Sequence, residues 1–221
     1  MDNHLIRFQE KKFLFIDFET FNLALHDSLN LPWQVAAIYI EAEDNGNGKI
    51  VNKEICRHDI YLKWDTDLKI GKEAKRITGY SETNFRQKCI PEEEGFKTIY
   101  DLVESCDYIV GHNVLGFDIF LLRNWYRKHG KPYKHLTSKV LDTLSIARSI
   151  NLGYQYKSSE CSMLEFQMKM LGIRKKGMRT SLGALGKSHD IKHDYAKLHD
   201  ALVDLELNLK VWDKLKYQID F

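Results

Sequence analysis

The sequence contains few prolines, and its few cysteines are scattered along the chain. The cysteine pattern limits the classes of fold and of metal site that the chain can form. The 221 residues include 3 prolines and 4 cysteines, and no two cysteines form a Cys-x-x-Cys pair. Neither a disulfide framework nor a cysteine zinc site is therefore expected. No repeat or low-complexity segment divides the chain, and its length suits one core. We expect a single domain over residues 1–221.

Long apolar runs and a one-sided charge are also missing. No run approaches the length that spans a bilayer, and the first residues lack the basic and apolar regions of a signal peptide. These absences favour a cytoplasmic protein with no membrane partner. Lys plus Arg number 33 and Asp plus Glu number 31, for a net charge of +2. Many nucleic-acid-binding domains are strongly basic, but a domain that holds metals with carboxylates can be balanced, so this charge excludes no partner.

What the chain does contain is a regular series of apolar segments. Strand-like runs between polar turns occur at 13–19, 33–41, 50–62, 108–111 and 140–141. Helical spacing occurs at 96–103, 118–128, 143–150 and 163–171, and most clearly from Leu198 to Trp212. This order of elements predicts an α/β fold, with a mixed central β-sheet of about five strands flanked by α-helices.

The first candidate site is a pair of carboxylates at the end of the first strand. Side chains two residues apart on a strand project from the same face, so Asp17 and Glu19 lie side by side. Two ionised carboxylates at the edge of a core repel each other unless cations neutralise them. Mg²⁺ and Mn²⁺ prefer such oxygen ligands. Taken alone, the pair is better explained as a solvated strand end.

Two further segments change that interpretation. Asp118 stands where a short strand turns into a helix, a position at which Asp is usually an N-cap. Asp204 follows His199 at the start of the last helix, in a leucine-rich stretch where an unpaired carboxylate is costly. Separately, a solvated Asp and a structural His are the simpler explanations. Together the three segments supply four carboxylates and one histidine, which is the set that a two-metal phosphodiesterase needs.

The four carboxylates and the histidine, taken in their order along the chain, resemble the motifs of the DEDD exonuclease superfamily, which is the DnaQ-like group. The matching residues are Asp17-Phe18-Glu19-Thr20 for the first motif, Asn113 with Phe117-Asp118 for the second, and His199 with Asp204 for the third. The tyrosine branch would need Tyr four residues before Asp204, where Asp200 stands, so the histidine branch is favoured. The resemblance covers about residues 12–213 and implies a ribonuclease-H-like fold. The second motif has one residue more than in many histidine-branch members, closer to the spacing in proofreading domains of family B polymerases, which leaves the subfamily open.

The resemblance implies a 3′→5′ exonuclease that uses two Mg²⁺ or Mn²⁺ ions and releases nucleoside 5′-monophosphates. The implied metal ligands are Asp17, Glu19, Asp118 and Asp204. His199 would be the general base that takes a proton from the attacking water. The residues expected to hold the terminal nucleotide are Phe18, Thr20, Leu23, His112, Asn113 and Phe117. Single-stranded 3′ ends of DNA are the favoured substrate.

Other functions stay open at this point. An RNA exonuclease or oligoribonuclease-like enzyme would share every motif residue, because backbone groups can contact a 2′-hydroxyl. An inactive nuclease-fold binding module is disfavoured by the intact residue set, and an endonuclease by the spacing of His199 and Asp204. The basic stretch 174–179 suits a solvated loop as well as a nucleic-acid contact. Nothing in the sequence supports a polymerase or sliding-clamp partner, and the oligomeric state is not predicted.

Overall fold

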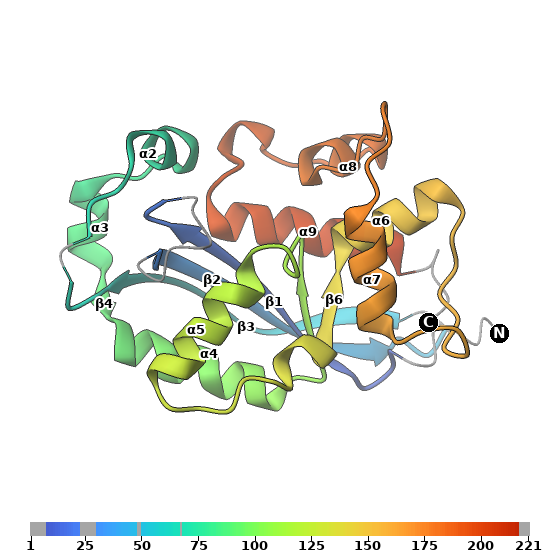
Figure 1. The fold of residues 1–221 in the computed structure, drawn as a ribbon, viewed down its shortest axis with the longest axis horizontal. Coiled ribbons are helices and arrows are strands. Elements are labelled where there is room, and N and C mark those ends of the chain that lie inside the picture. The colour runs from blue at the N-terminus through green and yellow to red at the C-terminus, as the bar shows by residue number, and fades with distance from the viewer. Residues whose placement is uncertain (1–7, 23–29, 48–49, 67, 217–221) are drawn as a thin grey trace.

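The fold is built around one six-stranded mixed sheet. The computed structural model describes residues 8–22, 30–47, 50–66 and 68–216 (Figure 1). Its strands lie in the order β4-β3-β2-β1-β5-β6. Their bounds are β1 Lys12–Thr20, β2 Pro32–Asp44, β3 Ile50–Lys63, β4 Ile90–Pro91, β5 Tyr108–Gly111 and β6 Val140–Asp142. The α/β prediction is confirmed, and the additional strand is β4, which is too short to leave a pattern in the sequence.

The strand β1 occupies the centre of the sheet. It pairs antiparallel with β2 and parallel with β5. Its apolar residues are buried on both faces, which explains their nearly continuous run in the sequence. Asp17 lies opposite Ala36 and Glu19 opposite Gln34, and the register shifts between Glu19 and Thr20. The two carboxylates therefore lie at the carboxyl end of the central strand, where regular pairing ends.

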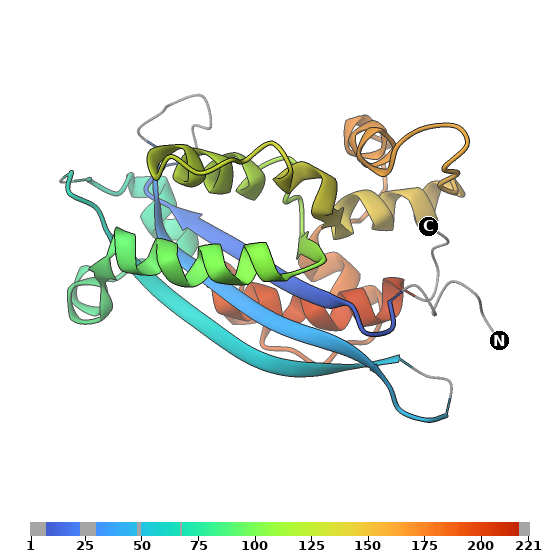
Figure 2. The same ribbon diagram turned by 90° about the horizontal axis from the view of Figure 1, so that it is seen from below.

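Alternate residues of β1 belong to two separate cores. Phe18 and the other even-numbered apolar residues pack with α4 (Glu92–Ser105) and α5 (Asp118–Lys128). Phe15 and Phe13 pack instead with α9 (Ala201–Leu215), which lies on the opposite face. Figure 2 shows α4 and α5 side by side along one side of the strands. The same alternation turns the side chains of the odd-numbered carboxylates toward α9.

The remaining helices cover the ends and flanks of the sheet. They are α2 Lys72–Thr78, α3 Glu82–Lys88, α6 Thr143–Leu152, α7 Met163–Gly172 and α8 Leu182–Ser188, with 3-10 turns at Leu136–Lys139 and Tyr195–Lys197. The predicted helical segments are confirmed, whereas α3 escaped prediction because seven residues give too little periodicity. Among the described residues, no helix combines the length and the apolarity that a bilayer crossing requires.

The last helix begins later than its apolar stripe indicates. The stripe predicts a helix from Leu198, but α9 spans Ala201–Leu215. Asp200 is the N-cap, and its carboxylate accepts hydrogen bonds from two backbone N–H groups of the first turn. His199 precedes the cap with a φ of +77°, which an α-helix cannot include. The capped start therefore sets Asp204 in the first turn of the helix.

Candidate active site

Three carboxylates meet between the end of β1 and the start of α9. Asp17, Glu19 and Asp204 each offer an oxygen, and these oxygens all lie within 4.8 Å of one another. All three side chains are half-buried. The strand alternation turns the first two toward α9, and the cap at Asp200 fixes the turn that carries the third. The structure thus brings together residues that are nearly 190 positions apart in the chain.

The fourth predicted carboxylate, Asp118, joins this group from another direction. It is the first residue of α5 and is 3% exposed. Its Oδ1 accepts a hydrogen bond of 3.1 Å from the backbone N–H of Phe18, between the two acidic residues of β1. The N-cap position belongs to Phe117, so Asp118 is not the ordinary cap that its position in the sequence suggested.

Burial and mutual repulsion raise the pKa values of these carboxyl groups. Burial, and then repulsion from Asp204 and Asp118, raises the pKa of Glu19 to about 9. Burial also raises the pKa of Asp118 to about 8 and that of Asp204 to about 6. The pKa of Asp17 is raised well above its usual value by burial and by its acidic neighbours. A divalent cation would displace the protons and neutralise the repulsion, and an all-oxygen donor set fits a hard cation such as Mg²⁺ or Mn²⁺.

The predicted general base lies at the edge of the carboxylate group. His199 is exposed, and its backbone N–H donates a hydrogen bond of 3.2 Å to Oδ1 of Asp204. The left-handed backbone at His199 lets the chain turn sharply before Asp200 caps the helix. The imidazole is thereby held next to the acidic cluster and in contact with solvent.

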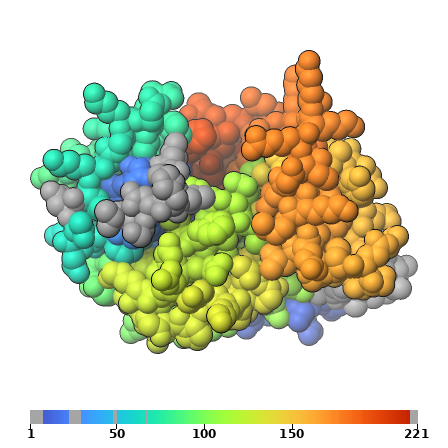
Figure 3. All heavy atoms as spheres, viewed as in Figure 1, coloured from blue at the N-terminus to red at the C-terminus, as the bar shows by residue number. Residues whose placement is uncertain are grey.

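A cavity of about 1010 Å³ opens onto this cluster. Asp17, Asp204 and His199 line one part of it. The lining also includes Arg148 and the segment 178–184, part of the orange segment that projects at the upper right of Figure 3. The cavity therefore combines cationic and neutral groups with the carboxylates, a combination that can hold a phosphate chain beside the acidic cluster.

The loop between β5 and α5 completes the cavity floor and is held by Asp142. This carboxylate is fully buried and accepts hydrogen bonds from the backbone N–H groups of Asn113, at 3.1 Å, and Leu115, at 2.9 Å. Asn113 has a φ of +66°, and a Cβ on Gly116 would lie 2.5 Å from its side-chain oxygen. The loop is therefore compact, and a side chain at position 116 would displace the amide of Asn113.

His112 joins the loop to the segment 178–184. Its Nδ1 lies 3.1 Å from Oγ1 of Thr143, and its ring also hydrogen-bonds with the backbone of Thr180. Burial lowers the pKa of the imidazole to about 4, so the ring is neutral at neutral pH. Both ring nitrogens are directed at protein groups, so this side chain shapes the cavity wall.

The six residues expected to hold a nucleotide fall into four groups. His112 and Asn113 line the cavity. The rings of Phe18 and Phe117 pack in or against the core, the former edge-on to Trp125 with 6.2 Å between ring centroids. Thr20 is buried, and its hydroxyl donates to the backbone carbonyl of Asn22. Leu23 lies outside the described residues. The backbone of Phe18, rather than its ring, contacts the acidic group.

Two residues of the site were missed in the sequence. Asp142 is not among the predicted site residues, although Asp-Thr before an apolar helix is a capping signal, and its carboxylate does accept from the N–H of Leu144. Arg148 lies one turn further along α6 and lines the cavity. No local pattern distinguishes an arginine that faces a cavity from one that faces solvent.

Comparisons with known proteins give consistent matches. The family described as Exonuclease matches residues 14–212. Exodeoxyribonuclease I of Buchnera aphidicola is 33% identical over 214 residues, which cover 94% of this chain and 47% of that protein. Among solved structures, E. coli Exonuclease I in complex with a dT13 oligonucleotide has a TM-score of 0.69 at 22% identity, over 94% of this chain and 41% of that chain. The zinc-bound form of the E. coli ExoI–ssDNA complex also has a TM-score of 0.69, at 23% identity over 95% and 41% of the two chains. The chain thus spans about half the length of the relatives it matches, and the shared fold is the ribonuclease-H-like one expected from the motifs.

Proposed function

Because the chain belongs to the exonuclease family, whose members are hydrolases that act on phosphodiester bonds, we propose that it removes nucleotides one at a time from the 3′ ends of single-stranded DNA. The observation that carries the proposal is the group of three carboxylate oxygens within 4.8 Å, at the mouth of a cavity that also contains His199. The preference for DNA rests on the Buchnera relative, which is an exodeoxyribonuclease. Nucleoside 5′-monophosphates are the expected products.

The four carboxylates are suited to hold two divalent cations, Mg²⁺ or Mn²⁺. When bound, such ions polarise the phosphate and stabilise the attacking and leaving oxygens. Asp17, Glu19 and Asp204 would hold one ion between them, because their oxygens lie within 4.8 Å of one another. Asp118 would help to hold the second ion, and its bond to the Phe18 backbone fixes its position relative to β1.

His199 is suited to take the proton from the attacking water. Imidazole is the side chain that exchanges protons most readily at neutral pH, and this ring is exposed beside the acidic cluster. The hydrogen bond from its backbone N–H to Asp204 keeps it at the reacting end of the cavity. A proton received there can pass to solvent, because the side chain is not enclosed.

An end-labelled cleavage assay tests the proposal. Single-stranded DNA, duplex DNA and RNA of one sequence are incubated with Mg²⁺, Mn²⁺ or EDTA, and the products are resolved by length. We expect a ladder that shortens from the 3′ end of single-stranded DNA and stops in EDTA. Asp17→Asn should lower the rate at least ~1000-fold, since one oxyanion-stabilising group is commonly worth 10²–10³ and this ligand holds cations as well. A faster reaction on RNA would redirect the proposal to an RNA exonuclease, and internal cuts would overturn it.

A second variant tests the proposed role of His199 as general base separately from metal binding. His199→Asn removes the imidazole but suits the left-handed backbone, because Asn adopts positive φ more easily than other residues. We expect a rate lower by roughly 10²–10⁴-fold with little change in Mg²⁺ affinity. An unchanged dependence of the rate on pH in this variant would rule out the base role while leaving the nuclease assignment intact.

A further inference from the structure

Gln34 is a polar exception in the strand next to β1. The first nine residues of β2, Pro32–Ile40, are all buried, and Gln34 is the only one of them with an amide or charged side chain. It is 0% exposed. Taking an amide out of water is costly unless both of its polar atoms find hydrogen-bond partners. The partners of this side chain therefore indicate what the residue is for.

Only one of the two polar atoms has a partner within the described chain. The side-chain Nε2 of Gln34 donates a hydrogen bond of 2.7 Å to Oδ1 of Asp59, on β3. A carboxylate only accepts, so the nitrogen of the amide must face Asp59 and its oxygen must face away. That oxygen, Oε1, is buried, and no described residue donates to it. The amide is thus held on one side and presents an accepting oxygen on the other.

This accepting oxygen is turned toward the acidic cluster. Because β2 lies between β3 and β1, a group that faces away from β3 lies on the side of β1. The residue of β1 directly opposite Gln34 is Glu19, in the last regular pair before the register shifts. The side chains of such a pair share one face of the sheet, with Cβ atoms about 4.5–5.5 Å apart. Oε1 therefore lies on the side where Glu19 meets Asp17 and Asp204.

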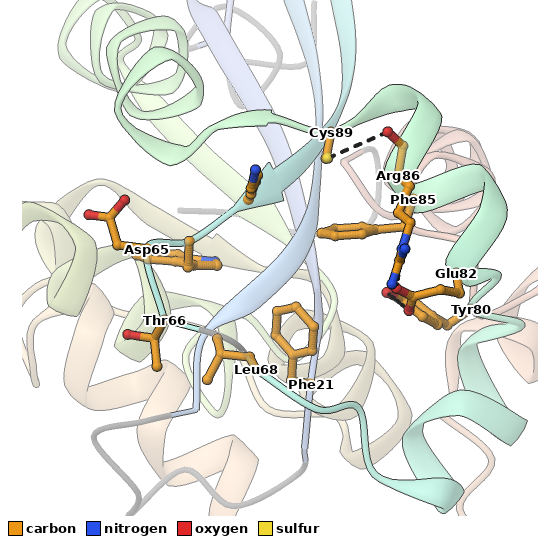
Figure 4. Close-up of a pocket in the computed structure, with 11 residues that line it drawn as sticks. Phe21, Asp65, Thr66, Leu68, Tyr80, Glu82, Phe85, Arg86 and Cys89 are labelled. Carbon is orange, nitrogen blue, oxygen red and sulfur yellow. Dashed lines mark hydrogen bonds and ion pairs between the residues drawn. The ribbon is translucent and has the colours of Figure 1, made fainter.

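Gln34 has no surface that a bound strand could touch. As far as the described residues define them, it lines neither the cavity at the carboxylates nor a second cavity, of about 460 Å³, beyond the end of β1. Figure 4 shows Phe21 and Phe85 on the wall of this second cavity. Any effect of the buried amide on the reaction must therefore pass through a neighbouring group. The neighbour on the side of its accepting oxygen is Glu19.

The donor that Oε1 lacks can arrive with a cation. Ionised carboxylates accept hydrogen bonds but donate none, so Glu19 and Asp204 cannot satisfy Oε1 while they hold an ion. Mg²⁺ in proteins usually keeps several of its waters, and each of these waters is a donor. Groups that hydrogen-bond to the surroundings of a bound metal orient its ligands and strengthen its binding.

We propose that Gln34 is a positioning residue of the cation site, whose Oε1 accepts a hydrogen bond from a water on the ion that Glu19 helps to hold. Asp59 fixes the amide in the orientation that this bond requires, although Asp59 is exposed and belongs to another strand. The inference rests on the proposed function, because it needs the cation. It extends the site to a buried group that neither ligates the ion nor touches the substrate.

The affinity of the DNA-free protein for Mg²⁺ tests the proposal without any cleavage. Gln34→Met keeps the length of the side chain and removes both amide groups. We expect its dissociation constant for Mg²⁺, measured by calorimetric titration, to rise about 10- to 100-fold, the usual loss when such a partner of a metal site is removed. Tyr39→Phe is the matched control, because it removes a hydrogen bond of 3.1 Å to Ser105 five residues further along β2. It should leave the constant unchanged. A wild-type constant in Gln34→Met would overturn the proposal.

A pair of variants at Asp59 separates orientation of the amide from charge. Asp59→Asn and Asp59→Ala both remove the negative charge, but only Asn keeps an oxygen that accepts from Nε2 of Gln34. Asp59 is exposed, so neither change threatens the fold. We expect Asp59→Ala to weaken Mg²⁺ binding, as Gln34→Met does, and Asp59→Asn to bind Mg²⁺ like the wild type. Equal weakening in the two variants would assign the effect to the charge of Asp59 and overturn the positioning role.

Cleavage kinetics distinguish a failure of this proposal from a failure of the nuclease function. At saturating Mg²⁺, Gln34→Met should keep the wild-type KM for single-stranded DNA, because Gln34 lines neither cavity. The Mg²⁺ concentration that gives half the maximal rate should rise by the same factor as the dissociation constant. If the wild type neither binds Mg²⁺ nor cleaves, the nuclease proposal itself fails. If it does both and Gln34→Met needs no additional Mg²⁺, only the role of Gln34 fails.

Thermal unfolding in EDTA separates a positioning role from a structural one. An amide that served only the fold would lower the melting temperature of Gln34→Met without changing its dependence on Mg²⁺, and this result would overturn the proposal. We expect the reverse, a melting temperature close to that of the wild type in EDTA and a smaller rise on addition of Mg²⁺. If Gln34→Met does not fold, the two Asp59 variants decide the question.

Discussion

At the scale of single residues, His112 shows how one ring can hold two walls of a cavity together. It contacts the side chain of Thr143 on one side and the backbone of Thr180 on the other. Both contacts are made by the neutral ring, because burial and the nearby Arg148 disfavour the imidazolium form. Protonation of His112 would therefore place a poorly solvated charge at the junction between the β5–α5 loop and the segment that leads into α8, and this charge would destabilise the junction.

This junction predicts a specific acid sensitivity. Burial lowers the pKa of His112 from 6.5 to about 4, so the unfolded chain binds this proton more readily than the folded one. The stabilising effect is fully present above pH 6.5 and is lost as the pH falls toward 4, with a magnitude on the order of 2–3 kcal/mol. We expect urea midpoints of the wild type and His112→Gln to differ by less at pH 4 than at pH 7. The difference between the two proteins isolates His112, since the acidic cluster titrates in both. An equal difference at both pH values would contradict the assignment.

The residues that sequence reasoning found are those with a local signal. Asp17 and Glu19 were recognised because a spacing of two places both on one face of a strand, and Asp204 because a carboxylate stood in an apolar helix. Asp142 was not assigned to the site, since its bond to the N–H of Asn113 spans 29 residues and leaves no local pattern.

At the scale of elements, one carboxylate serves both a helix and a loop. Asp142 caps α6 through the N–H groups of Leu144 and Ser145, and it also holds the backbone of Asn113 and Leu115. The helix start and the loop that leads to α5 are therefore fixed by the same group. A change at Asp142 must affect both at once.

We expect Asp142→Asn to loosen the loop more than the helix. An amide keeps one accepting oxygen for the cap but presents N–H groups where the loop needs an acceptor, so one or two buried backbone donors lose their partner. The expected cost is roughly 2–4 kcal/mol. Hydrogen exchange should rise at residues 113–118 more than at 146–150. Ser162→Ala, which removes a helix cap away from the cavity, is a matched control and should cost about 1 kcal/mol without raising exchange in the loop.

Element boundaries were predictable where side-chain periodicity and capping agree. Five strands and the helices α4, α5, α6, α7 and α9 followed from period-2 and period-3.6 patterns. The start of α9 did not, because the apolar stripe includes Leu198, whereas the cap at Asp200 and the positive φ of His199 set the actual boundary. The short elements α3 and β4 depend on tertiary contacts rather than on their own sequence.

At the scale of the whole molecule, the acidic cluster makes stability depend on cations. Its carboxyls have raised pKa values, about 6 for Asp204, 8 for Asp118 and 9 for Glu19. A raised pKa contributes stability that is present at low pH and lost as the pH rises through it. In the absence of cations the protein should therefore become less stable between pH 6 and 9. Cation binding opposes this loss by neutralising the ionised groups.

Thermal unfolding with and without Mg²⁺ measures this linkage. We expect Mg²⁺ to raise the melting temperature more at pH 8.5 than at pH 6, because fewer protons must be displaced at the higher pH. At a concentration one hundred times its dissociation constant, a bound ion contributes about 2.7 kcal/mol. Asp204→Asn should melt higher than the wild type in EDTA and respond less to Mg²⁺. A response of equal size at both pH values would contradict the linkage.

The three elements that supply the acidic cluster are also separated in time during synthesis. Asp17 is made early, Asp118 about 100 residues later, and Asp204 only with α9, the last helix in the described part of the chain. A chain that emerges from the ribosome therefore carries β1 and α5 for several seconds before the third element exists, at the usual pace of 5–20 residues per second. An incomplete or truncated chain lacks Asp204 and His199 and so cannot assemble the site. The order of the elements thus delays the assembly of the candidate site until α9 has been made.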